Sequence, residues 1–172
     1  MGKKSVKANK NIYFQSREKA GLTRAQASEL MGFVSESRIE KIETDKVIVH
    51  PEDVVAMADA YKNPSLCNYF CANECRIGQD YIPEIKLSSL AEISLGILAS
   101  LNALNQQKDR LIEISEDGKI SDDELPDFIK IKDRLEKLSV TIDSLRLWMD
   151  HAVVNNDIDQ EAIEKMVNSL ND

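Results

Sequence analysis

The 172-residue sequence lacks any run of about 18 consecutive apolar residues, the length that a membrane-spanning helix needs. Its first residues include lysines, but no apolar stretch follows them, so we find no secretory signal peptide. We expect a protein without a membrane segment that stays in the cytoplasm.

Cysteine is also scarce. The three cysteines are Cys67, Cys71 and Cys75, an odd number crowded into one short segment, unlike the framework of a secreted disulfide protein. Two interpretations remain for them. If a helix ends near Asn73, Cys71 and Cys75 could share a metal or a disulfide. A metal would need further ligands, and His50 is the only histidine in the N-terminal half of the chain. Otherwise these small side chains pack one helix onto its neighbours, which we favour, and we expect neither metal nor other cofactor.

Arrangements typical of catalysis are missing as well. The sequence contains no Ser/His/Asp or Cys/His pattern, no glycine-rich phosphate loop and no clustered pair of carboxylates. We therefore predict that the protein is not an enzyme.

Negative charge is in excess, but it is unevenly placed. The net charge is −8. Residues 1–64 carry 11 Lys/Arg and 9 Asp/Glu, whereas the rest of the chain carries 11 and 21. A polyanionic partner should therefore meet the N-terminal part, with the acidic remainder facing away.

The N-terminal part reads as a compact all-α domain. Residues 1–10 resemble a basic, flexible arm, and residues 11–75 contain closely spaced helix caps and breakers. The sequence predicts five short helices, at residues 12–20, 24–31, 36–44, 51–61 and 65–73.

The C-terminal part has a different pattern. Residues 76–86 contain Gly78 and Pro83 without helical periodicity, so we expect a linker there. Within residues 87–172, apolar residues recur alternately every three and four positions in two stretches, 87–111 and 128–152. The first stretch has lapses at Ser94 and Lys108, and this spacing is typical of long packed helices. We predict a long antiparallel helical hairpin whose second helix covers about 122–154, then a helix at 160–170. Because this hairpin carries more apolar surface than two helices can bury, we expect it to be the dimerisation region of a homodimer.

Residues 113–124 resemble an EF-hand calcium loop, with Asp117, Gly118 and Glu124 at matching positions. Glu113 stands where that family has aspartate, which should weaken calcium binding. A plain turn explains the same residues, because Gly118 can end one helix while Ser121 and Glu124 form a capping box for the next. We favour the turn.

Residues 21–43 carry the most informative pattern. The elements are residues 21–24 (Gly-Leu-Thr-Arg), residues 31–32 (Met-Gly), Ser35, and residues 39–43 (Ile-Glu-Lys-Ile-Glu). They describe two short capped helices that meet at a glycine turn, with an outward polar face on the second. Here the sequence resembles the Cro/phage-repressor-like (XRE) family of helix-turn-helix transcriptional regulators.

The resemblance implies a site on double-stranded DNA, with residues 36–44 as the recognition helix. The implied base-contacting residues are Glu36, Ser37 and Lys41. The implied phosphate-contacting residues are Thr23, Arg24, Arg38, Thr44 and Lys46. The resemblance also implies a structural ion pair between Arg17 and Glu43.

The sequence departs from the family pattern in three ways. The turn has one extra residue between Gly32 and Ser35, Asp45 stands where glycine is common, and Glu36 and Glu40 face the expected DNA. Glu36 could accept a hydrogen bond from a cytosine amino group. The same charges suit an alternative function, that of an adaptor that binds another protein through this domain and the hairpin. The main prediction is a sequence-specific regulator that binds operator DNA as a dimer.

Overall fold

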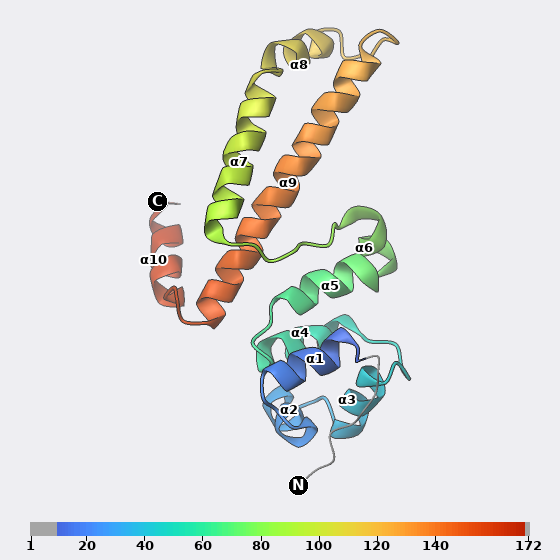
Figure 1. Ribbon diagram of the computed structural model, residues 1–172, viewed down its shortest axis with the longest axis vertical. Helices are drawn as coiled ribbons and strands as arrows, with labels where there is room; N and C mark the ends of the chain where they lie inside the picture. Colours follow the sequence, from blue (N-terminus) through green and yellow to red (C-terminus); the bar gives the residue numbers. More distant parts are fainter. Residues whose placement is uncertain (1–9, 171–172) are drawn as a thin grey trace. The chain divides into compact units, whose positions relative to one another are not determined.

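The computed structural model describes residues 10–170, and every regular element among them is a helix (Figure 1). This confirms the predicted all-α fold. Two compact units are present. One contains the described residues up to Glu84 together with those from Asp150 onward, and the other is Ile85–Met149. Apart from Lys10, the predicted arm lies outside the described residues.

The first unit begins with the five expected helices. They are α1 (Ile12–Lys19), α2 (Arg24–Met31), α3 (Glu36–Glu43), α4 (Pro51–Ala60) and α5 (Ser65–Asn73). Each starts at its predicted residue and ends within one residue of its predicted end, because the caps and glycines that mark these ends are local signals. The unit also holds the end of α9 and all of α10 (Gln160–Leu170), whose bounds match the prediction.

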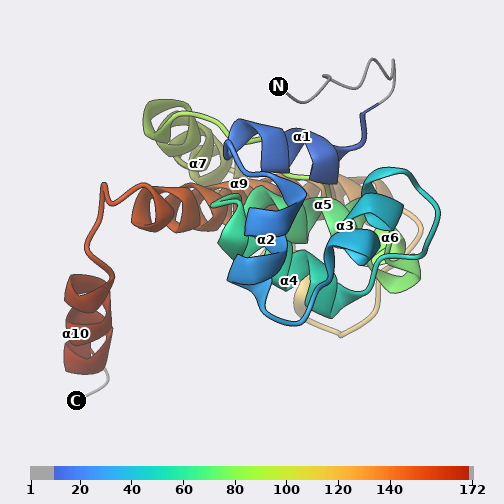
Figure 2. The same ribbon diagram turned by 90° about the horizontal axis from the view of Figure 1, so that it is seen from below.

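The five helices enclose one hydrophobic core. Each contributes a side chain that is at most 1% exposed: Tyr13, Ala27, Ile39, Met57 and Leu66. Helix α2 lies beside both α3 and α4, and α4 lies beside α5 (Figure 2). Burial of a large apolar side chain contributes roughly 1.5–3 kcal/mol, so this shared core fixes the orientation of α3.

The structure differs from the expected linker in its first half, because Arg76–Tyr81 form a short helix, α6, that packs on α5. A Cβ atom at Gly78 would lie 1.9 Å from the carbonyl oxygen of Cys71, so only glycine lets the two helices approach this closely. The glycine that suggested a linker is a packing residue. The three cysteines, half-buried and without disulfides, pack against the same core.

The second unit contains an antiparallel hairpin, as predicted. Its helices are α7 (Leu90–Asn105), α8 (Lys108–Ser115) and most of α9 (Leu125–Val154). Helices α7 and α9 lie side by side in opposite directions (Figure 1): the α-carbon side of Gly96 faces Thr141, and further along α7 the carbonyl of Ala103 accepts a hydrogen bond from Arg134. The apolar pattern of residues 87–111 lapses at Lys108. This residue is the first of α8 and follows the break between α7 and α8.

The connection between α8 and α9 has the geometry of a capped turn. Gly118 has a φ of 69°, the left-handed conformation that favours glycine. The Glu124 carboxylate accepts hydrogen bonds from the Ser121 backbone N–H at 3.0 Å and from its hydroxyl at 2.5 Å. The last carboxylate of the calcium-like pattern is thus engaged in the capping box that the alternative interpretation requires.

Within the range 10–170, no helix combines the length and the apolar character that crossing a membrane requires.

Candidate nucleic-acid interface

Helices α2 and α3 are each fixed at their first turn by a side-chain cap. The Thr23 hydroxyl accepts from the backbone N–H of Gln26 at 3.2 Å, while the Gln26 side chain accepts from the Thr23 backbone N–H at 2.9 Å. Ser35 caps α3 by accepting from the backbone N–H of Arg38 at 3.3 Å. Gly32, with a φ of 74°, ends α2. These local bonds set where the two helices begin.

The extra residue of the turn is accommodated because two neighbouring side chains, Phe33 and Val34, point in different directions. Val34 is buried, whereas Phe33 is exposed. One added side chain therefore points outward, and the apolar anchor of the turn is kept.

Helix α3 has two distinct faces. Ile39 and Ile42 are buried in the core. Glu36, Ser37, Glu40 and Lys41 are exposed. The exposed set includes all three residues implied to contact bases, and it forms a polar helical face of the kind that enters a major groove.

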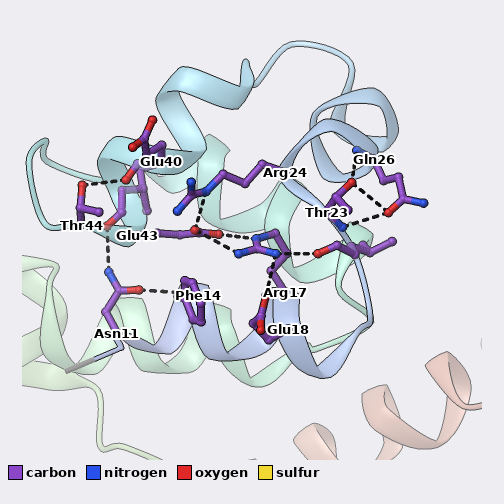
Figure 3. A network of polar contacts seen from close by, with 12 residues as sticks. Asn11, Phe14, Arg17, Glu18, Thr23, Arg24, Gln26, Glu40, Glu43 and Thr44 are labelled. Atoms are coloured by element: carbon purple, nitrogen blue, oxygen red, sulfur yellow. Dashed lines mark hydrogen bonds and ion pairs between the residues drawn. The ribbon is translucent and has the colours of Figure 1, made fainter. Parts of the chain in front are cut away.

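A buried carboxylate organises the region between α1, α2 and α3 (Figure 3). The Glu43 side chain is fully buried and accepts from Arg17 Nε at 2.5 Å and Arg17 Nη2 at 3.2 Å. This confirms the ion pair that the resemblance implied. Burial alone would lower the pKa of Arg17, but the hydrogen bond and the charge of Glu43 raise it by more. The pKa of Arg17 therefore lies above its ordinary value, and the guanidinium remains charged.

Glu43 also holds Arg24, which the sequence did not indicate. Arg24 Nε donates to Glu43 Oε2 at 2.8 Å, and the Arg24 side chain is 34% exposed. One carboxylate thus neutralises part of two arginines. Because Arg24 remains partly accessible at the start of α2, it can still face a phosphate group.

A second buried carboxylate holds Arg38. Asp53, from the first turn of α4, accepts from Arg38 Nε at 2.8 Å and from Arg38 Nη2, and also from the His50 backbone N–H at 3.0 Å. The Arg38 side chain is 31% exposed. A bidentate pair restricts the guanidinium to one orientation, so Arg38 is positioned before any ligand arrives.

The C-terminal end of α3 is tied to α1. The Asn11 side-chain amide donates to the Ile42 carbonyl at 2.8 Å and to Asp45 Oδ1 at 2.9 Å. Asp45 has a φ of 56°, which explains why the family pattern often has glycine there. The bond from Asn11 helps Asp45 adopt this conformation. Thr44 donates to the Glu40 carbonyl at 2.7 Å, and the exposed Lys46 follows.

The predicted site residues therefore gather on α2, α3 and the segment that follows α3, all exposed or partly exposed. Sequence reasoning missed the acidic partners of the two arginines. No spacing rule pairs Arg38 with Asp53, because the pair joins separate helices.

The sequence comparison agrees with this geometry. Residues 15–64 match the family model of a helix-turn-helix domain. The match spans α2, the turn and α3, and it extends across α4. No curated protein and no solved structure matches the chain. The N-terminal unit thus contains a helix-turn-helix domain, a fold whose second helix typically binds DNA.

We expect Asp53→Asn to destabilise the helix-turn-helix domain by about 1–2 kcal/mol at neutral pH, since it removes a charged partner of a partly exposed arginine. Burial alone would raise the pKa of Asp53, but the hydrogen bonds from Arg38 and the His50 N–H lower it by more. The net pKa lies below the ordinary value of 3.8. The ionised carboxylate therefore stabilises the fold above that value, and this contribution is lost as the pH falls through the lowered pKa.

Urea unfolding of both proteins between pH 7 and pH 2.5 measures this difference. The gap between native protein and variant should close at the acidic end. Asp59→Asn, an exposed change on the same helix, should have little effect. A gap that stays constant with pH would show that the Asp53 charge is not what stabilises α4 and Arg38.

Proposed function

We propose that this protein is a sequence-specific transcriptional regulator of the XRE type that binds operator DNA as a homodimer. Residues 36–44 enter the major groove, with Glu36, Ser37 and Lys41 at the base edges. Thr23, Arg24, Arg38, Thr44 and Lys46 contact the phosphate backbone.

The proposal is carried by the exposed face of α3. It is uncovered, and arginines held by buried carboxylates accompany it: Arg24 through Glu43 and Arg38 through Asp53. Both arginines keep about a third of the side chain accessible, so their guanidinium groups can still reach a phosphate. Fixed cations beside an exposed polar helix suit a ligand with regularly spaced phosphates.

The dimer is supported by the surface of the hairpin. Leu135, Ile142 and Met149 recur on α9 at seven-residue intervals and are all exposed. This heptad spacing suits the packing of a second helical hairpin. A dimer would place two copies of α3 on one operator and double the few phosphate contacts that one domain makes.

The two glutamates on α3 favour a second candidate, a protein-binding adaptor. Glu36 and Glu40 are both exposed on the face that would meet the duplex. A carboxylate beside DNA is unfavourable unless it accepts a hydrogen bond, for example from a cytosine amino group.

Selection of bound duplexes from random DNA, followed by a salt titration, separates the two functions. A regulator selects a sequence with two-fold symmetry, and the logarithm of its affinity falls steeply with the logarithm of the salt concentration, by about 0.9 per phosphate contact. No enrichment and no binding at low salt would reject the regulator and leave the adaptor.

A further inference from the structure

Lys10, at the start of the described chain, is an exposed cation whose position is fixed. Its backbone carbonyl accepts a hydrogen bond from the Gln15 side-chain amide at 2.5 Å. Its ammonium group lies over the Phe14 ring, with Nζ 4.4 Å from the ring centroid. Within residues 10–170 no carboxylate forms an ion pair with Lys10, so its charge is available to a ligand.

Asn11 brings Lys10 close to Lys46. The Asn11 side-chain amide donates to Asp45 Oδ1 at 2.9 Å and to the Ile42 carbonyl at 2.8 Å. Lys10 directly precedes Asn11, and Lys46 directly follows Asp45. The two lysines therefore flank one hydrogen bond at the end of the recognition helix.

Phe14 connects Lys10 to the buried ion pairs. Arg17 Cζ lies 5.0 Å from the centroid of the same Phe14 ring. Arg17 in turn shares the Glu43 carboxylate with Arg24 (Figure 3). This series of contacts runs from Lys10 to Arg24, a residue proposed to contact phosphate. Lys10 thus has a proposed phosphate contact on each side.

We propose that Lys10 is a further phosphate-contacting residue, positioned by Phe14 and Asn11. This role rests on the proposed binding of DNA and extends that site onto the start of α1. A side chain already held on an aromatic ring loses less rotamer freedom on binding, which favours the contact. An unpaired ammonium that reaches a phosphate also releases a counterion from the duplex.

Lys10→Ala in the full chain tests the contact. Binding is measured by fluorescence anisotropy at several salt concentrations, with the operator selected from random DNA and with a duplex of unrelated sequence. The variant should bind both duplexes several-fold more weakly at low salt. The slope of the logarithm of affinity against the logarithm of salt concentration should fall by about one for both. Lys10→Arg, which keeps the charge, should retain the native slope.

Lys19→Ala is the matched control, because Lys19 is exposed at the other end of α1. Its slope should equal that of native protein. A native slope in Lys10→Ala, or equal losses in the two alanine variants, would overturn the Lys10 contact without affecting the proposed function. If native protein binds neither duplex at low salt, the regulator is rejected and the Lys10 contact falls with it.

Phe14→Leu tests the positioning by the ring, since leucine keeps an apolar side chain but has no aromatic face. In this background Lys10→Ala should reduce affinity by a smaller factor than it does in the native background. Binding is compared at a temperature at which thermal unfolding shows every variant to be folded. Equal factors in the two backgrounds would overturn the positioning role of Phe14.

The charge of Asp45 gives a test in the opposite direction. Its carboxylate lies beside Asn11, between the segments that carry Lys10 and Lys46, and should oppose the approach of a phosphate. Asp45→Asn removes the charge, keeps an oxygen that can accept from Asn11, and suits the φ of 56°. Affinity for both duplexes should rise several-fold at low salt. An unchanged affinity would show that no phosphate lies beside Asp45 and would overturn the proposed place of Lys10 in the site.

Discussion

Glu43→Gln is expected to lower the free energy of unfolding of the helix-turn-helix domain by roughly 3–5 kcal/mol, the range seen when one member of a buried ion pair is removed. Glu43 is fully buried and is the shared partner of Arg17 and Arg24. Glutamine keeps the shape but removes the charge, so the buried Arg17 is left with the half-exposed carboxylate of Glu18 as its remaining counter-ion. For a chain of this size such a loss corresponds to a fall in Tm of roughly 6–20 °C.

Thermal and urea unfolding followed by circular dichroism measure the effect, and the chain offers a matched control. Glu40 lies one turn earlier on α3 and is exposed, so Glu40→Gln should change stability by less than about 0.5 kcal/mol. Replacing the pair together, as Arg17→Met with Glu43→Leu, should restore much of the stability, since no charge is then left buried. Equal Tm values for Glu43→Gln and native protein would contradict the central role of this carboxylate.

Replacing the positioned cations is expected to change DNA binding in two different ways. Under the proposed function, Arg24→Ala and Arg38→Ala should weaken binding to all sequences alike, because each removes a proposed phosphate contact. Each should also lower by about one the slope with which the logarithm of affinity falls against the logarithm of salt concentration. Lys41→Ala should instead relax the choice of base at one position of each half-site, by roughly 1–3 kcal/mol, with a smaller change of slope.

Fluorescence anisotropy with the selected operator and single-base variants, at several salt concentrations, distinguishes these effects. Lys19→Ala is the matched control, since it removes one exposed positive charge from α1, outside the assigned surface. If it lowered the slope as much as Arg24→Ala does, the effect would come from net charge and not from a defined site. If Lys41→Ala lost affinity equally for all operator variants, Lys41 would have to be assigned to the phosphate backbone instead of a base edge.

The short helices could be predicted because their signals act over a few residues. Thr23, Ser35 and Pro51 mark helix starts, and Gly32 marks an end, by capping or backbone conformation alone. The inward positions Ile39 and Ile42 likewise follow from helical periodicity. The candidate face of α3 is then simply the side opposite these two residues.

The linker prediction failed in its first half for an equally physical reason. Gly78 carries the same local signal whether it loosens the chain or lets two backbones approach. Only the position of Cys71, seven residues earlier and across a helix contact, decides between these meanings.

By itself, the sequence determined that the chain is helical, where the first five helices begin, which side of α3 faces the core, and that the hairpin is rich in apolar positions. Tertiary structure alone decided which carboxylates hold Arg24 and Arg38 and which apolar residues remain exposed. Caps and periodicity act within about one helical turn. The pairs Arg38–Asp53, Arg24–Glu43 and Arg17–Glu43 join residues 15, 19 and 26 positions apart, and they form only once a common core has brought their helices together.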